Sequence, residues 1–85
     1  MFYVYVLKSQ KDGFLYTGYT KDLRKRFAEH NTGKTKSIKH RIPFKLVYYE
    51  AYLDKTDARK RELELKNKCQ QREFLMDRIR NSLLV

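Results

Sequence analysis

The sequence predicts a small α/β protein of the α+β type, with a three-stranded, mostly antiparallel sheet flanked by helices in the order β-β-α-β-α-α. Three runs of aromatic and β-branched residues predict the strands, at residues 2–7, 14–19 and 44–52. Asp12-Gly13 is a turn signal, because glycine supplies a positive φ, so the first two strands should form a hairpin. Charged segments with apolar residues at helical spacing follow and predict helices that cover the sheet.

The first strand is apolar on both faces, so it should lie in the centre of the sheet with cover on each side. Gly18, near the end of the second strand, permits a close approach of another group to the backbone, or a bulge. The sequence does not fix the register of this hairpin. Whether the hydroxyls of Tyr5 and Tyr16 converge is therefore left open.

The first helix is predicted to begin with a cap at Thr20 and to run to about residue 30. Asp22 falls in its first turn, where a negative charge is favourable. Leu23 and Phe27 are four residues apart and should form its buried stripe. The following segment, residues 31–43, is predicted to be a basic loop.

The second helix should be capped by Asp54 and should bury a line of side chains along one face. This predicted inward line consists of Ala58, Glu62, Leu65 and Cys69. Glu64 lies about 200° further round the helix than Glu62 and should face water.

A last helix is predicted from Arg72 to Leu84. Its inward side chains are expected to be Phe74, Leu75, Ile79 and Leu83.

With 85 residues, of which 41% are apolar, the chain predicts one domain with a small core, spanning residues 1–85. No apolar run approaches the ~20 residues needed to cross a membrane. The N-terminal segment lacks a basic lead-in and a cleavage site, so it indicates a strand and not a signal peptide. Cys69 is the single cysteine, which excludes an internal disulfide and a multi-cysteine metal site. We expect a cytoplasmic protein without a disulfide partner.

The formal net charge of +10 favours a polyanionic partner. Between Asn31 and Lys45 there are four lysines, one arginine and one histidine, and no acidic residue. Such clustering argues against a charge that serves solubility alone. From the charge alone, that partner could be DNA, RNA or an acidic membrane surface.

Glu62 is the first candidate for chemistry, because an inward carboxylate costs several kcal/mol unless it is paired or bound to a metal. One interpretation is a structural ion pair with Arg59, Arg61 or Lys66 on the same helix. The other is a ligand for Mg²⁺ or Mn²⁺, since such ions accept one carboxylate together with water and phosphate oxygens.

Arg26 and His30 are four residues apart and share one side of the first helix. They could be a solvated basic face. They could also act on a substrate, because arginine binds phosphate oxygens bidentately and histidine can relay a proton.

Five segments in this order resemble the GIY-YIG nuclease family. Tyr3-Val4-Tyr5 is followed after ten residues by Tyr16-Thr17-Gly18 and then by Asp22, Leu23, Arg26 and His30. Two later segments are similar to the small stand-alone bacterial branch of that family: residues 46–50, and Ala58, Arg61, Glu62, Leu65 and Lys66. The resemblance covers roughly residues 2 to 75.

The resemblance implies a metal-dependent phosphodiesterase whose partner is DNA, with RNA as an alternative and no membrane. Because the sequence shows no base-reading module, we expect a structure-selective or non-specific endonuclease of DNA repair or processing. The resemblance also implies a role for each matching residue. Tyr5 helps to activate water, Tyr16 supports it, Gly18 keeps the strand end open, Arg26 steadies the phosphate, His30 assists and Glu62 binds Mg²⁺ or Mn²⁺. Nearby cations are expected to favour the phenolate of Tyr5.

Two other hypotheses remain. The chain could be a nucleic-acid-binding module with weak or lost nuclease activity, or a structural or interaction domain. Support for a binding module comes from the small size, the lack of a targeting domain and a missing asparagine. Larger family members place that asparagine after the glutamate, and the possible counterparts here, Asn67 and Asn81, are not well aligned with it. The residues expected to contact nucleic acid are Lys25, Lys34, Lys36, Lys39, His40, Arg41, Arg61 and Lys66.

Overall fold

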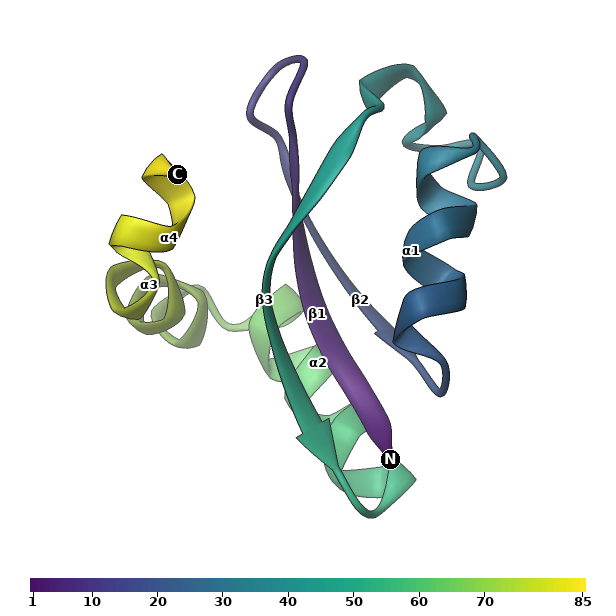
Figure 1. Ribbon diagram of the computed structural model, residues 1–85. Coiled ribbons are helices and arrows are strands. Elements are labelled where there is room, and N and C mark those ends of the chain that lie inside the picture. The colour runs from purple at the N-terminus through teal and green to yellow at the C-terminus, as the bar shows by residue number, and fades with distance from the viewer.

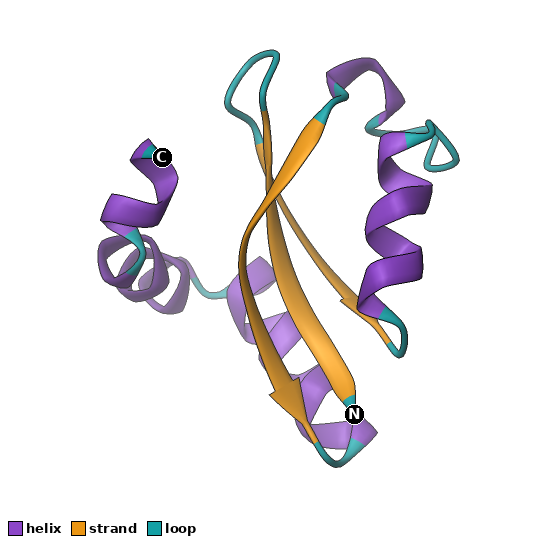
Figure 2. Ribbon diagram, viewed as in Figure 1, coloured by secondary structure: helices purple, strands orange, loops and turns teal.

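The computed structural model describes residues 1–85 and confirms the predicted fold class. Three strands form one antiparallel sheet in the order β2-β1-β3, and helices lie on both sides of it (Figures 1 and 2). The elements are β1 (Phe2–Ser9), β2 (Leu15–Thr20), α1 (Leu23–Asn31), a 3₁₀ helix (Lys39–Arg41), β3 (Phe44–Tyr52), α2 (Lys55–Asn67), α3 (Cys69–Arg78) and α4 (Arg80–Leu84).

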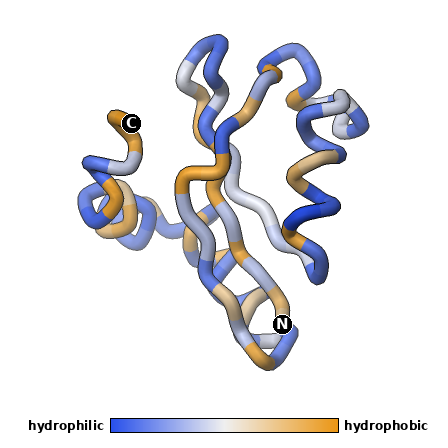
Figure 3. Tube along the Cα trace, in the orientation of Figure 1, coloured by the Kyte–Doolittle hydropathy of each residue, from blue (hydrophilic) through white to orange (hydrophobic).

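Strand β1 is the centre of the sheet, as its apolar sequence predicts, and hydrophobic residues gather along β1 and β3 in Figure 3. Val4 and Val6 point to one face, where they pack in a buried cluster with residues of α2 and α3. Tyr5 and Leu7 point to the opposite face, where α1 provides the cover. The alternation of side chains along a strand therefore divides the core into two halves.

The register of the sheet sets the neighbours of Tyr5. The β1–β2 hairpin pairs without interruption, and it places Gly18 opposite Tyr5. On the other side, β1 and β3 are out of step between Val6 and Leu7, as a β-bulge produces. Tyr49 then lies opposite Tyr5 on β3. Tyr5 is thus flanked by a glycine on one strand and a tyrosine on the other.

Helix α1 begins later than predicted. Thr20 still belongs to β2, and Asp22 is the N-cap, because its carboxylate accepts a hydrogen bond from the backbone N–H of Lys25 at 3.1 Å. The hydroxyl of Thr20 instead accepts a hydrogen bond from the Asp22 backbone N–H at 3.1 Å. The predicted stripe is confirmed, since Leu23 and Phe27 pack on the Tyr5 side of the core.

The basic loop after α1 is tied to the body of the protein. The side chain of Asn31 accepts a hydrogen bond from the backbone N–H of Phe44 at 2.6 Å and donates one to its carbonyl oxygen at 3.0 Å. Ile38, in the middle of the loop, is buried among the residues that cover Tyr5. These anchors hold the loop cations next to α1.

The predicted inward line of α2 holds for Ala58, Glu62 and Leu65, which are all buried. It fails at Cys69, which is exposed. Helix α2 ends at Asn67, and Lys68 has an extended backbone with φ −113° and ψ 103°. The chain changes direction there, so Cys69 starts α3 and no longer follows the face of α2.

The last predicted helix is two helices. The break falls at Ile79, whose backbone leaves helical geometry with φ −103° and ψ 20°. Leu75 and Ile79 are buried and Leu83 packs against the core, as predicted, but Phe74 is exposed to 60% and the prediction for it was wrong. None of the helices combines the length and the apolar character that crossing a bilayer requires.

Candidate active site

Tyr5 lies flat against its cross-strand neighbour Gly18. A Cβ atom added to Gly18 would come within 2.3 Å of the Tyr5 hydroxyl oxygen and 2.4 Å of the ring carbon Cζ. No side chain fits at such distances, so the glycine provides the space that the tyrosine ring occupies. The predicted close approach to the Gly18 backbone is confirmed, and the group that approaches is Tyr5.

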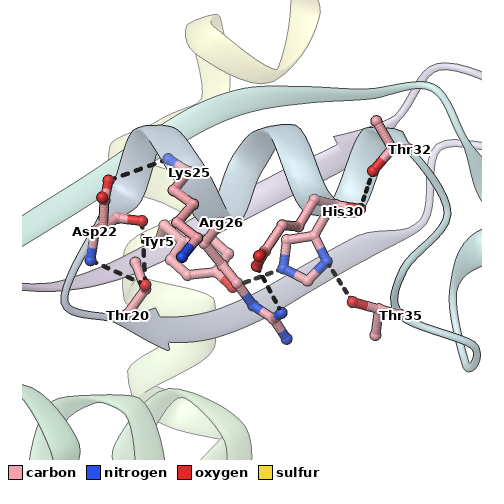
Figure 4. Close-up of polar contacts among 9 residues, drawn as sticks. Tyr5, Thr20, Asp22, Lys25, Arg26, His30, Thr32 and Thr35 are labelled. Atoms are coloured by element: carbon pink, nitrogen blue, oxygen red, sulfur yellow. Dashed lines mark hydrogen bonds and ion pairs between the residues drawn. The ribbon is translucent and has the colours of Figure 1, made fainter.

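The hydroxyl of Tyr5 makes a hydrogen bond with His30 across the interface between the sheet and α1 (Figure 4). The Tyr5 oxygen lies 2.7 Å from Nε2 of His30, and Nδ1 of the same ring lies 3.1 Å from Oγ1 of Thr35. His30 is completely buried. Burial lowers the pKa of His30, and the charge of Arg26 lowers it further. The imidazole is therefore neutral at pH 7, with one nitrogen that donates and one that accepts.

Tyr16 completes an aromatic group around His30. Its ring centre lies 5.1 Å from that of His30, in an edge-on arrangement, and 6.4 Å from that of Tyr5. The regular hairpin brings both tyrosines to the same face of the sheet, since Tyr16 pairs with Leu7 and Tyr5 with Gly18. The question of convergence, which the sequence left open, is thereby answered for the rings.

Arg26 lies beside the Tyr5 hydroxyl, one turn before His30 on α1 (Figure 4). Its Nη1 makes an ion pair with Oε1 of Glu29 at 3.2 Å, and 36% of its side chain is exposed. Burial acts to lower the pKa of Arg26, but Glu29 and Tyr5 raise it above the ordinary value. The guanidinium is thus permanently charged and still has donors free for an anion.

The pKa of Tyr5 is shifted in the direction opposite to that expected from its neighbouring cations. Burial raises the pKa of Tyr5 to about 12, and the nearby Tyr16 raises it too, while Arg26 acts in the opposite direction. The arginine has the expected sign, but the loss of solvent outweighs it. In the free protein Tyr5 is therefore a neutral hydroxyl, hydrogen-bonded to Nε2 of His30.

Glu62 is the buried carboxylate of α2, exposed to 6%. Its Oε1 pairs with Nη1 of Arg59 at 3.1 Å and its Oε2 with Nζ of Lys66 at 2.9 Å. The ammonium group of Lys66 lies 6.0 Å from the ring centre of Tyr16, on edge strand β2. The charge of Glu62 is close enough to Tyr5 to add to the rise in the pKa of Tyr5. The ion pairs considered from sequence are formed with Arg59 and Lys66.

The protein side chains near Glu62 fit a metal ion that takes most of its ligands from water and from the substrate. No group of three histidine, cysteine, aspartate or glutamate side chains is close enough to hold an ion by itself. Mg²⁺ needs only one or two carboxylates when phosphate oxygens and water complete its shell. Glu62 supplies one carboxylate, and its two partners are half-exposed side chains that can move into solvent.

The predicted nucleic-acid contacts divide into two groups. Those with exposed side chains and no ion pair are Lys25, Lys34, Lys36, Lys39 and His40. The others are occupied within the protein. Arg41 pairs with Asp12 at 2.6 Å and covers the ring of Phe14, Arg61 pairs with Glu50 at 3.0 Å, and Lys66 pairs with Glu62.

Two residues of this site were not predicted as part of it. Thr35 holds the second nitrogen of His30 from within the basic loop, and no sequence pattern marks it. Arg59 was considered only as an ion-pair partner, yet its guanidinium also stacks over Tyr19 at 4.1 Å, on edge strand β2. Asn67 and Asn81, considered as counterparts of a family asparagine, are both exposed. Asn67 is the last residue of α2, and Asn81 lies in α4.

The sequence that forms this fold and site matches a known class of protein. Residues 1–74 match the GIY-YIG catalytic domain, so the chain belongs to the GIY-YIG family, a nuclease family whose members generally use divalent metals. The resemblance expected from the sequence is confirmed.

Within that family the chain is similar to small bacterial UPF0213 proteins. The one from Staphylococcus saprophyticus is 47% identical, over 85% of this chain and 88% of its own length. Those from Streptococcus agalactiae and Streptococcus pneumoniae are 47% and 42% identical, over 81% and 96% of this chain and 78% and 85% of their own lengths. No solved structure matches.

Proposed function

We propose that this protein is a divalent-metal-dependent endonuclease that hydrolyses phosphodiester bonds in DNA, either at particular DNA structures or without sequence preference, in DNA repair or processing. In this proposal residues 1–85 are one nuclease domain that works in the cytoplasm, and RNA is an alternative substrate. The observation that carries it is the Tyr5 hydroxyl, 2.7 Å from Nε2 of a buried, neutral histidine and beside the guanidinium of Arg26.

Tyr5 and His30 act together as the base. The attacking water gives a proton to the Tyr5 oxygen while the Tyr5 proton passes to Nε2 of His30. The tyrosine stays neutral throughout, so its pKa of about 12 is no obstacle. The relay requires Nε2 of His30 to be the acceptor and Nδ1 to carry the hydrogen. Oγ1 of Thr35, 3.1 Å from Nδ1, is placed to accept that hydrogen.

Arg26 binds the scissile phosphate. Its free N–H groups donate to a non-bridging oxygen and stabilise the charge that grows there in the transition state. The hydroxide attacks phosphorus, the bond between phosphorus and the leaving oxygen breaks, and solvent protonates the leaving oxygen. Glu29 positions the guanidinium through its ion pair.

Glu62 is the proposed ligand of a divalent ion, Mg²⁺ or Mn²⁺. When bound, such an ion supplies positive charge to the phosphate and to the leaving oxygen. Arg59 and Lys66 neutralise the buried carboxylate in the free protein. They lie along edge strand β2, next to Tyr16 and Tyr19, where both can turn to substrate phosphates.

A second candidate, a nucleic-acid-binding module without cleavage, is favoured by one observation. Both oxygens of Glu62 are already ion-paired, as a purely structural carboxylate would be. Net charge and the exposed loop lysines serve binding equally well with or without chemistry.

Plasmid nicking separates the two functions. The endonuclease predicts conversion of supercoiled DNA to the open circle in Mg²⁺ or Mn²⁺ and none in EDTA. Binding without any nicking in either ion supports the second candidate, and equal cleavage in EDTA contradicts the metal dependence.

A further inference from the structure

A groove of about 460 Å³ lies on the α1 side of the sheet, next to the candidate site but outside it. Its apolar lining comes from Tyr3 on β1, Tyr49 on β3 and the Leu23 and Phe27 side of α1. Two exposed cations, Lys21 and Arg24, line it as well. The groove thus combines aromatic rings with positive charge, and neither the ion pairs nor the proton relay uses its residues.

Tyr49 is the least covered aromatic residue of the sheet. It is exposed to 54%, and its only aromatic neighbour is Tyr3, at 6.0 Å between ring centres and 63° between planes. The hydroxyls of Tyr48 and Tyr52, on the same strand, both donate hydrogen bonds to Glu50, whereas that of Tyr49 makes none in the protein. Much of the Tyr49 ring is therefore available to a ligand.

The groove adjoins the reacting groups because of the sheet register. Tyr49 lies directly opposite Tyr5 in the antiparallel pair. Side chains in such positions point to the same face, with Cβ atoms roughly 5 Å apart. The ring of Tyr5 leans the other way, over Gly18 and toward His30. If a nucleic acid strand has one phosphate bound at Tyr5 and Arg26, its next nucleotide lies beside the ring of Tyr49.

Aromatic rings bordered by lysine and arginine are the usual means of holding single-stranded nucleic acid, because bases stack on the rings and phosphates meet the cations. Asp22 also lines the groove, but its carboxylate already accepts from the Lys25 backbone. A base that is stacked and paired in a duplex cannot reach such a ring. We propose that this groove binds one unstacked base beside the scissile phosphate, so that the preferred substrates carry an unpaired nucleotide there. The inference rests on the proposed nuclease function and narrows its substrate class.

The test measures binding in EDTA, where no cleavage interferes. Fluorescence anisotropy compares a labelled mixed-sequence single strand with the duplex of the same sequence, for the wild type and for Tyr49→Ala. We expect Tyr49→Ala to weaken single-strand binding about tenfold and to change duplex binding by less than about twofold. Tyr49→Phe keeps the stacking face and should bind like the wild type.

Phe74→Ala is the matched control, since Phe74 is an equally exposed aromatic residue on α3 and belongs to the other side of the sheet. It should bind both probes like the wild type. Thermal melting checks that every variant is folded. Because Tyr49 is exposed, its replacement should leave the fold intact. Equal weakening of both probes by Tyr49→Ala, or no weakening at all, overturns the inference.

Nicking in Mg²⁺ keeps this inference separate from the proposed function. If the wild type cleaves with metal and Tyr49→Ala binds single strands as well as the wild type, the groove proposal is wrong and the proposed nuclease function stands. The absence of cleavage, together with a selective loss of single-strand binding in Tyr49→Ala, supports the groove and contradicts the nuclease.

Discussion

Tyr5 and His30 are 25 residues apart in the sequence, and the hydroxyl of the first lies 2.7 Å from Nε2 of the second. Both side chains are almost completely buried, and the Arg26 guanidinium stands beside them. A hydroxyl held between a neutral imidazole and a fixed cation can take a proton from water without becoming a phenolate. This pair is the basis of the proposed mechanism.

Tyr5→Phe removes only the oxygen of that pair. Packing should survive, at a cost of about 1–3 kcal/mol, because Nε2 of the buried His30 loses its partner. Cleavage should fall about 10²-fold or more, because the proton path is interrupted, while DNA affinity stays the same. The measurements are nicking rates and binding titrations.

Tyr52→Phe is the control for this substitution, because its hydroxyl bonds to Glu50 on the other side of the sheet. It should keep full activity. A Tyr5→Phe protein that cuts at the wild-type rate would reduce Tyr5 to a packing residue.

Gly18→Ala tests the space under Tyr5. The added methyl would overlap the tyrosine ring, so we expect a loss of about 1–3 kcal/mol in the free energy of unfolding and a drop in cleavage, because the ring must move. Gly13→Ala is the control. Gly13 has a φ of 78° and no atom near its Cβ position, so stability should fall by about 1 kcal/mol with activity retained. Unchanged stability in Gly18→Ala, measured by thermal melting, would contradict the close packing.

Acid should abolish the proposed nuclease activity through His30. Burial and Arg26 lower the folded pKa of His30 below its ordinary value of 6.5, against a smaller opposite effect of Glu29. The unfolded state then takes up a proton at higher pH than the folded state. The contribution of His30 to the stability of the folded protein is therefore complete above about pH 6.5 and is lost as the pH falls through the folded pKa.

Activity should follow the same titration, because only the neutral ring accepts the Tyr5 proton. We expect kcat/KM to fall only in a range below pH 6.5. His30→Gln, which cannot titrate, should melt with a weaker dependence on acid than the wild type. If the pH profile of kcat/KM has its midpoint above pH 6.5, and His30→Gln removes that midpoint, the assignment of a lowered pKa to His30 is wrong.

The basic loop should supply the salt dependence of DNA binding. Replacing Lys34, Lys36 and Lys39 by alanine removes three exposed charges, so the slope of log affinity against log salt should flatten by roughly 2–3. Arg41 is left out, because it is held by Asp12 and Phe14. A control triple variant replaces Lys55, Lys60 and Lys68, which are exposed on and just after α2. An equal effect in both variants would show that the loop is not the contact surface.

The strands and the first two helices were predictable, because aromatic runs and a turn glycine mark the strands, helical spacing marks α1 and the capping Asp54 marks the start of α2. The cap of α1 was predicted at Thr20 and lies at Asp22. Tyr5 beside Gly18 was partly predictable, since a strand glycine indicates a close approach. The break at Lys68 was not, because neither glycine nor proline marks it and the packing of Leu75 on the core decides where α3 runs.

Charged side chains were the least predictable part of the site. Arg41 and Arg61 were expected to bind nucleic acid, yet their partners Asp12 and Glu50 lie 29 and 11 residues away in the sequence. Only the folded sheet brings those carboxylates to them. Thr35 reaches His30 for the same reason, since Ile38 and Asn31 fix the loop between them.

Glu62→Gln separates a metal ligand from a carboxylate that only forms ion pairs. If Glu62 is the metal ligand, the neutral amide should abolish nicking in Mg²⁺ and Mn²⁺ and weaken Mn²⁺ binding, while the fold and DNA binding remain. Glu64→Gln, which alters a half-buried glutamate of α2 without an ion pair, should nick like the wild type. The decisive result is the plasmid-nicking rate of Glu62→Gln beside its melting temperature: loss of nicking in a folded protein supports the account, and wild-type nicking with a lowered melting temperature contradicts it.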